Sequence, residues 1–343
     1  MPHRTFLAFI WPSLLAMTLF IAVPIVSVIW QSFYVEHHQI LVETENCGPF
    51  GCTKSVTVDA EAMRELREAE PMGRFNGLGT YTNPSHLALD EVAALWSQSD
   101  SWVGFVKALL NLPFYKALLF TLTFTFVVTP LVIVLGFFVA VAVDSIPSRI
   151  KGPVIFFSIL PMIVTPLIGA LVLYWMIDSR GIIGATLQMI FADPDLSLKA
   201  SPTLTWLTLL VYGVWHNAPF AFVVFYAGLQ TVPRDTLESA MVDGASRWER
   251  IRFVTIPYLL PLATFIALMQ LMDNFRVFEP IIGFSAAASA TSLSYLIYTD
   301  LRAGDSPLFG SAGATSVLTI VGVMILLTPV LVRNWREFNR RRA

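Results

Sequence analysis

Charged side chains are scarce in this sequence, which argues against an ordinary soluble protein. Asp, Glu, Lys and Arg together make up 13% of the 343 residues, about half the share found in typical soluble domains. Apolar residues make up 55%, and the mean hydropathy is +0.67. The composition therefore predicts a membrane protein, and no nucleic acid partner is expected.

Motifs of common enzymes are also absent. The sequence contains no G-x-x-x-x-G-K-[ST] phosphate loop, so this chain is not expected to hydrolyse ATP by that route. It contains neither H-E-x-x-H nor G-x-S-x-G, and its five histidines do not cluster with carboxylates in a metal-binding pattern. We therefore predict no catalytic residue, metal site or cofactor in this chain, and expect a conformational role instead.

Long apolar runs, by contrast, recur along the chain, and each is long enough to cross a bilayer as a helix. They occupy residues 6–30, 117–143, 153–177, 205–229, 257–277 and 310–332. The first run, within an N-terminal segment 1–32, has a cleaved signal peptide as its alternative because Arg4 precedes it. It is long for a signal peptide and ends without a small-x-small site. We expect an all-α polytopic membrane protein with six transmembrane helices.

The polar stretches between the runs are expected to lie outside the bilayer. Residues 33–116 form an acidic segment that predicts a soluble insert, with a short helix over 58–70 in which Arg64 and Glu68 pair at i,i+4. Residues 102–115 are amphipathic and predict an interfacial segment. The short apolar piece 182–191 predicts a re-entrant or surface helix.

Cys47 and Cys52 are the only cysteines, and both fall in the insert. If the insert faces an oxidising compartment, a small disulfide loop between them is predicted. Free thiols are one alternative. A metal site with His37 and His38 is another, because the ligand types suit a metal, although the spacing matches no recognised zinc motif.

The distribution of Lys and Arg in short loops predicts the orientation. With both termini in the cytoplasm, the cytoplasmic segments hold Arg4, Arg149, Lys151, Arg234, Arg247, Arg250, Arg252, Arg333, Arg336, Arg340, Arg341 and Arg342. The short outside connectors hold only Arg180, Lys199 and Arg302. The insert then lies outside, whereas the basic tail 333–343 and the loop 232–256 lie in the cytoplasm.

This loop, residues 232–256, is called the charged loop below. Its charged side chains cannot lie unpaired in hydrocarbon, so the loop must meet water or another protein. Gly244, at its middle, permits a tight bend. We expect short helices over 238–242 and 245–253 on either side of this glycine, and re-entry into the membrane at Pro257 and Pro261.

The charged loop resembles the EAA loop of permease subunits of bacterial ABC importers, in which E-A-A is followed by D-G-A and then I-x-L-P. The residues in register are Glu238, Ala240, Asp243, Gly244, Ala245, Trp248 and Pro257, whereas Ser239 and Ile256 depart from the pattern. Gly228, Leu229, Gln230, Val232 and Pro233 match the lead-in of the sugar-transporting branch.

The resemblance implies a type I importer permease fold over residues 117–332 with an extracytoplasmic insert, in the bacterial inner membrane. It also implies a heterodimer with a second permease, a dimer of ATPase subunits that bind ATP and Mg²⁺, and an extracytoplasmic solute-binding protein. The implied contacts with the ATPase are Glu238, Ala240, Asp243, Gly244, Ala245 and Trp248.

Polar and aromatic residues inside the fourth and fifth runs are candidates for substrate contact. Intramembrane polar groups usually face the bundle interior or a water-filled cavity, and similarity to the maltose-type permease implies sugar contacts from these two places. The candidates are Trp215, Asn217, Phe220, Gln270, Asp273 and Asn274. The alternatives are interhelical hydrogen bonding by the amides and pairing of Arg276 with Glu279.

The implied function is inward translocation of a sugar, glycoside or polyol. One alternative is an importer of another solute, such as glycerol phosphate or a polyamine. Another is a secondary transporter in which Asp273 and Glu279 relay protons or sodium ions.

Overall fold

The computed structural model describes residues 3–48, 51–303 and 307–340. The chain forms two compact units: Met1–Tyr115 with Leu296–Val321, and Lys116–Tyr295 with Gly322–Ala343. Three helices run from one unit into the other. They are α7 (Pro113–Ser145), α16 (Leu293–Leu301) and α17 (Phe309–Arg340).

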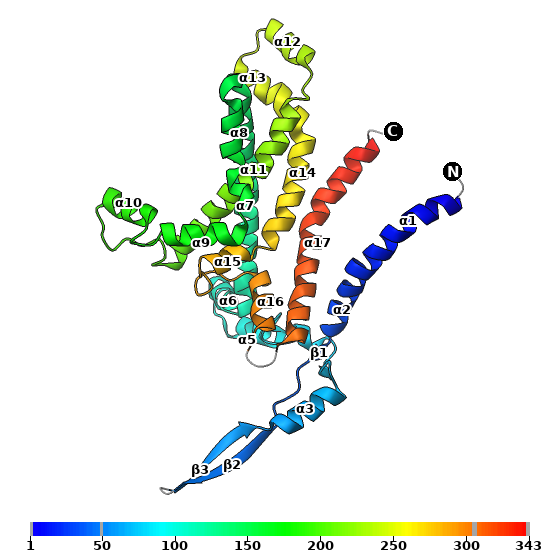
Figure 1. Cartoon of the computed structure of the whole chain (residues 1–343), viewed down its shortest axis with the longest axis vertical. Coiled ribbons are helices and arrows are strands. Elements are labelled where there is room, and N and C mark those ends of the chain that lie inside the picture. The colour runs from blue at the N-terminus through cyan, green and yellow to red at the C-terminus, as the bar shows by residue number, and fades with distance from the viewer. Residues whose placement is uncertain (1–2, 49–50, 304–306, 341–343) are drawn as a thin grey trace. The chain divides into compact units, whose positions relative to one another are not determined.

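The second unit is built on packed apolar helices (Figure 1). Besides α7, these are α8 (Ser148–Ile163), α11 (Pro202–Leu229) and α14 (Ile256–Phe275). The core includes Phe120, Phe222 and Ile266, all buried. α7 and α11 approach closely at Gly136, where an added Cβ would lie 2.5 Å from the Cβ of Ala221. Close approach of this kind is how membrane helices gain packing energy in the absence of a hydrophobic driving force.

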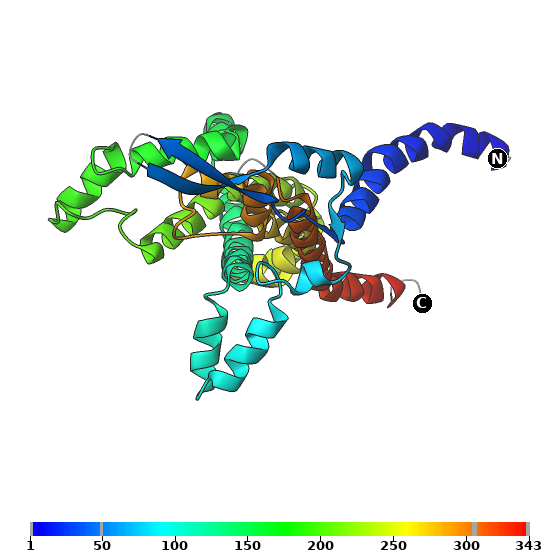
Figure 2. The ribbon, with the colours of Figure 1, turned by 90° about the horizontal axis from the view of Figure 1, so that it is seen from below.

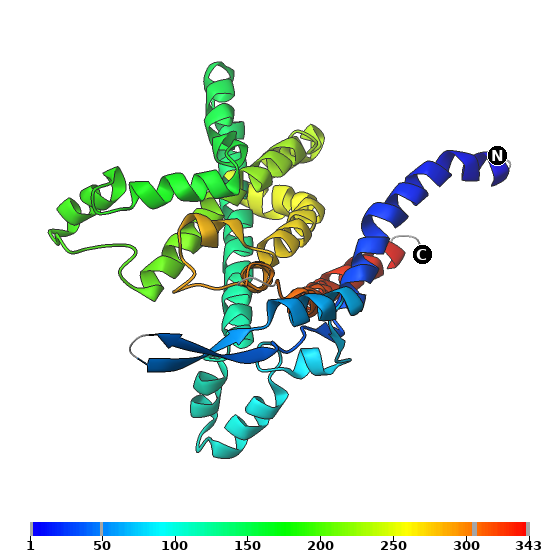
Figure 3. The same ribbon diagram turned by 60° about the horizontal axis from the view of Figure 1, so that its bottom comes forward.

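The third apolar run is not the straight span predicted over 153–177. It is divided into α8 and α9 (Pro166–Met176), whose axes differ by 96° across a short break, and the turn is visible in Figures 1 and 3. The break has a local cause: Pro166 disfavours the helical conformation at the residue before it, and Thr165 is extended, with φ −60° and ψ 145°.

The connector after α9 contains a short apolar helix, α10 (Ile182–Phe191), over the residues predicted for it. Lys199 Nζ lies 3.0 Å from Asp178 Oδ2, which ties the two ends of this connector together. The hydrogen bond from Lys199 and one from the backbone of Arg180 hold the pKa of Asp178 below its usual range. A second short helix, α15 (Glu279–Gly283), follows α14.

The first unit begins with α1 (His3–Met17), the π-helical turn η1 (Thr18–Ala22) and α2 (Val23–Gln31). Together they provide an apolar helix over Ala8–Gln31. Among the described residues, five helices are long and apolar enough to cross a membrane, or six if the bent pair α8–α9 counts as one span. The larger number agrees with the six predicted spans.

The insert contains strands that an all-helical prediction did not include. β1 (Tyr34–Val35) pairs with β4 (Arg74–Phe75), and β2 (Leu41–Gly48) pairs antiparallel with β3 (Gly51–Val58). The second pair forms the long twisted ribbon in Figure 2. Its polar, β-branched residues suit a two-stranded ribbon.

The helix predicted over 58–70 is confirmed as α3 (Ala60–Ala69). Asp59 caps it by accepting hydrogen bonds from the backbone of Glu61 and Ala62, and Arg64 Nε lies 3.0 Å from Glu68 Oε1. The remaining helices of the insert are α4 (Gly79–Thr82), α5 (Leu89–Gln98) and α6 (Trp102–Leu109). The segment predicted to lie in the interface, residues 102–115, is divided between α6 and the first residues of α7, which begins at Pro113.

Cys47 and Cys52 are directly opposite in the β2–β3 register. Opposite residues of an antiparallel pair have Cα atoms about 4.5 or 5.5 Å apart, within the range that a disulfide spans. We expect both thiols to resist alkylation in unfolded protein until a reductant is added, as mass spectrometry would register. The closed loop is short, so the bridge should stabilise the ribbon by about 2 kcal/mol. Alkylation without reductant would contradict the predicted disulfide.

Candidate functional site: the charged loop and a buried polar cluster

The charged loop begins with α12 (Arg234–Val242), which ends in a corner centred on Gly244. The Gly244 N–H donates to Met241 O at 3.1 Å, and the Ala245 N–H donates to Ala240 O at 2.9 Å. Gly244 has φ +83°, the left-handed conformation that glycine adopts without a steric cost. These features together form a Schellman motif, so the D-G-A sequence is the local cause of the bend.

A capping box starts the next helix immediately after this corner. The Ser246 N–H donates to Glu249 Oε2 at 2.8 Å, and the Glu249 N–H donates to Ser246 Oγ at 3.3 Å. This reciprocal pair satisfies two amide groups that the first helical turn leaves free. Backbone groups on both sides of the bend therefore have hydrogen-bond partners, and these hydrogen bonds fix the geometry of the corner.

The second helix of the loop is not the separate helix predicted over 245–253. α13 (Arg247–Arg250) continues through the π-helical turn η2 (Ile251–Thr255) into α14, giving a 29-residue helical stretch, Arg247–Phe275. Pro257 lies inside this stretch, just after the π-helical turn η2, and local π adjustments of this kind let membrane helices accommodate proline. A displacement at α13 therefore acts directly on a long membrane helix.

The base of the charged loop is closed by a hydrogen bond between its two ends. The Tyr258 hydroxyl, on α14, donates to Thr231 O at 2.9 Å. Thr231 lies between the end of α11 and the start of α12, so this bond links the entry of the loop to its exit. This bond thereby joins α14 to the segment that follows α11.

Apolar side chains project from the charged loop. Val242 is 88% exposed and Trp248 57% exposed, and Met241 and Phe253 are exposed as well. Glu238, Asp243 and Gly244 also lie at the surface, whereas Ala240 and Ala245 are half-buried at the inner side of the corner. Grouped exposed apolar residues of this kind mark a surface for another molecule.

A buried polar cluster lies inside the bundle of the second unit. Asn274 of α14 donates to Thr129 Oγ1 of α7 at 3.1 Å and to Gln270 Oε1 at 3.3 Å, and it accepts from Asn217 Nδ2 of α11 at 3.4 Å. Asn274 and Gln270 are only 2% and 3% exposed. We call Thr129, Asn217, Gln270 and Asn274 the polar cluster. It connects three helices through one amide side chain.

The other predicted substrate residues do not join the polar cluster. Asp273 is exposed, and its Oδ1 lies 3.1 Å from Arg276 Nη2; pairing of Arg276 with Glu279 was the alternative considered from the sequence. Adjacent residues point about 100° apart around a helix, which separates Asp273 from Asn274. Trp215 is 42% exposed, and the ring of Phe220 lies 6.5 Å from that of Phe265.

Thr129 was missed as a member of the cluster, although the sequence carried a signal for it. Thr121, Thr125 and Thr129 recur every fourth residue of an apolar run and so share one helix face. All three are buried, and Thr121 Oγ1 accepts a hydrogen bond from the Leu293 N–H at 3.2 Å. Tyr212 was also missed; its hydroxyl donates to Pro166 O, at the break between α8 and α9, at 2.6 Å.

The bundle of membrane-length helices, with a polar cluster inside it, defines a polytopic membrane protein. Residues 101–337 match the family described as the binding-protein-dependent transport system inner membrane component. The match covers most of the chain, and the chain belongs to this family.

Relatives of known function are transport permeases. The trehalose/maltose transport system permease protein MalF of Thermococcus litoralis is 29% identical over 227 residues, which cover 64% of this chain and 75% of that protein. The diacetylchitobiose uptake system permease protein DasB of Streptomyces coelicolor is 24% identical over 250 residues, which cover 71% of this chain and 76% of that protein.

A solved structure supports the fold. It is a crystal structure of a bacterial ABC transporter involved in the import of the acidic polysaccharide alginate, and one of its chains is 19% identical with a TM-score of 0.60. The likeness covers 80% of this chain and 96% of that one. The architecture is therefore that of an ABC importer permease.

Proposed function

We propose that this chain is one half of the heterodimeric pore of an ABC importer that carries a sugar, glycoside or polyol into the cell. A second permease forms the other half, and a solute-binding protein delivers the substrate from outside. A dimer of ATPase subunits, which bind ATP and Mg²⁺, drives alternating access. Both termini and the charged loop lie in the cytoplasm, and the insert lies outside.

The observation that carries the proposal is the continuity of α13 with α14. The exposed corner at Gly244 offers a docking surface, and the helix that follows runs without interruption to Gln270 and Asn274. A stretch of 29 residues is about 43 Å long. A rigid element pinned at its base can pass a rigid-body shift over that length, so an ATPase bound at Trp248 would act on the polar cluster.

The carbohydrate class follows from the relatives and is compatible with the polar cluster. Amide and hydroxyl groups can donate to and accept from sugar hydroxyls, and Trp215 and Phe220 on α11 supply aromatic faces. The secondary-transporter alternative is less well supported. Its proposed relay groups, Asp273 and Glu279, are both exposed, and Asp273 is already paired with Arg276.

Reconstitution in liposomes tests this proposal. The chain is purified after co-expression with a second permease, an ATPase and a binding protein of the same importer class, and labelled trehalose, maltose and diacetylchitobiose are supplied outside with ATP inside. Uptake of a sugar is expected only when ATP and the binding protein are both present. Uptake by this chain alone, driven by a proton or sodium gradient, would show a secondary transporter instead.

A further inference from the structure

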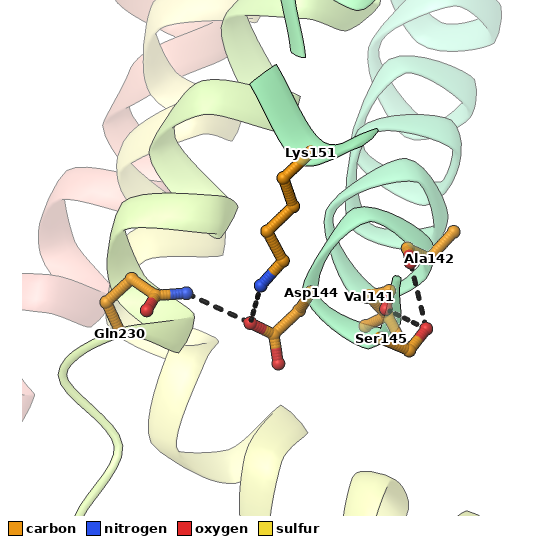
Figure 4. Close-up of polar contacts among 6 residues, drawn as sticks. All are labelled: Val141, Ala142, Asp144, Ser145, Lys151 and Gln230. Carbon is orange, nitrogen blue, oxygen red and sulfur yellow. Dashed lines mark hydrogen bonds and ion pairs between the residues drawn. The ribbon is translucent and has the colours of Figure 1, made fainter. Parts of the chain in front are cut away.

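One carboxylate connects three helices beside the entry to the charged loop. Asp144, at the end of α7, accepts a hydrogen bond from Gln230 Nε2 at 3.0 Å, and Lys151 Nζ of α8 lies 3.7 Å from the same oxygen. Gln230 directly follows α11, and Figure 4 shows both side chains converging on Asp144 Oδ1. The contact therefore links α7, α8 and α11 at one point.

Local features hold both sides of this contact in place. The Ser145 hydroxyl donates to Val141 O at 3.0 Å and to Ala142 O at 2.8 Å, which closes the last turn of α7. Lys151 Nζ also lies 5.9 Å from the ring centroid of Tyr226 on α11, within the range of a cation–π interaction. Lys151 thus contacts the last turn of α11 at Tyr226, and Asp144 contacts Gln230, the residue that follows α11.

Gln230 is also close to the charged loop along the chain. Only three residues separate it from Arg234, the first residue of α12. One of them, Thr231, is held by Tyr258 of α14, and another, Val232, is buried. The entry to the loop is therefore attached to α14 through Thr231 and to α7 and α8 through Gln230.

We propose that Asp144 is a positioning residue that makes α7 and α8 follow the charged loop when the ATPase moves it. This inference rests on the proposed coupling function. The Tyr258 bond and the continuous α13–α14 helix move α14 with the loop, but neither acts on α8. α8 already packs on α11 through apolar side chains. The Asp144 oxygen adds a directional connection at the loop entry itself, because a shift of Gln230 would break its hydrogen bond unless α7, and α8 through Lys151, moved too.

Static stability is not the expected role of this contact. The side chains of Lys151 and Asp144 are 25% and 47% exposed, and ion pairs with such exposure contribute little to folding. The appropriate measurement is therefore a response to ATP. The Lys199–Asp178 pair offers a matched control, because its side chains are 25% and 40% exposed and it lies in the connector after α9.

The experiment measures spin-label distances in the complete complex in nanodiscs, with Cys47 and Cys52 replaced by serine. One label pair joins Val242 in the charged loop to Ile150 in α8, and a reference pair joins Val242 to Met189 in α10; all three side chains are exposed. In the wild-type background, ATP should shift the reference distance and leave the Val242–Ile150 distance unchanged.

Asp144→Ala and Gln230→Leu should each produce an ATP-dependent shift or broadening of the Val242–Ile150 distance. The double variant should behave like Asp144→Ala, because removing Asp144 already deprives Gln230 of this partner, and Asp178→Ala should behave like wild type. If Asp144→Ala does not assemble, Gln230→Leu alone decides, since Gln230 lies outside the helix and at the surface.

An unchanged Val242–Ile150 distance in Gln230→Leu after ATP addition would overturn the role of Asp144. Additive effects in the double variant would do the same, since they would mean that the two side chains act separately. If ATP shifts neither distance in wild type, the proposed coupling function is wrong. That result can be distinguished from a failure of the Asp144 proposal, because it is seen in wild type without any variant.

Discussion

Gly244→Asp is expected to remove the ATPase subunits from the purified complex and to abolish uptake, while the chain still accumulates in the membrane. Gly244 is exposed, and an added Cβ would meet no heavy atom within 4 Å in this chain. The substitution therefore strains only the left-handed backbone, at a cost of roughly 1–2 kcal/mol. A carboxylate buried without a partner at a protein interface costs about 3 kcal/mol or more, roughly a hundredfold in affinity.

Two further variants separate these effects. Gly244→Ala carries the backbone strain without the charge, so it should weaken ATPase association less than Gly244→Asp. Gly152→Asp adds the same carboxylate at a glycine of α8 that also has no neighbour within 4 Å and lacks the positive φ. It should retain the ATPase in co-purification. Equal retention by Gly244→Asp and Gly152→Asp would mean that no partner packs against the corner.

Asn274→Leu is expected to reduce sugar uptake by about tenfold or more, equivalent to about 1.4 kcal/mol or more, while ATPase association persists. Leucine has a similar volume but cannot replace the hydrogen bonds to Thr129, Gln270 and Asn217. Side-chain hydrogen bonds between membrane helices contribute about 0.6 kcal/mol each, so the stability loss should be about 2 kcal/mol.

The concentration dependence of uptake distinguishes a substrate contact from a purely structural one. If Asn274 binds the sugar, the variant should raise KM or lower kcat at equal amounts of complex. If the polar cluster only joins helices, thermal stability falls and the kinetics of the surviving complex stay unchanged. Thr264→Val is the control, because the exposed Thr264 hydroxyl on the same helix donates to Leu260 O, one turn earlier in that helix, and its loss should affect neither quantity.

Features that depend only on neighbouring residues could be predicted before the fold was known. The helix over 58–70 was predictable because the Arg64–Glu68 pair needs only one helical turn, and the bend at Gly244 was predictable because a Schellman motif is complete within six residues. The apolar runs located the membrane-length helices for the same reason, since length and hydropathy are local properties. The strands β2 and β3 were missed, because their mostly polar sequences carry little of the hydrophobic alternation that reveals a strand.

Only the tertiary structure decided which distant side chains meet. Gln230 and Asp144 are 86 residues apart, and Asn274 and Thr129 are 145 apart; nothing in either local sequence specifies the other partner. The 96° turn between α8 and α9 was likewise undetermined: Pro166 explains why the helix stops, but packing of α9 against α15, close at Gly283 and Ala170, decides where the next helix goes. A hydrogen bond between helices depends on their relative rotation and depth, and those are set by the packing of the whole bundle.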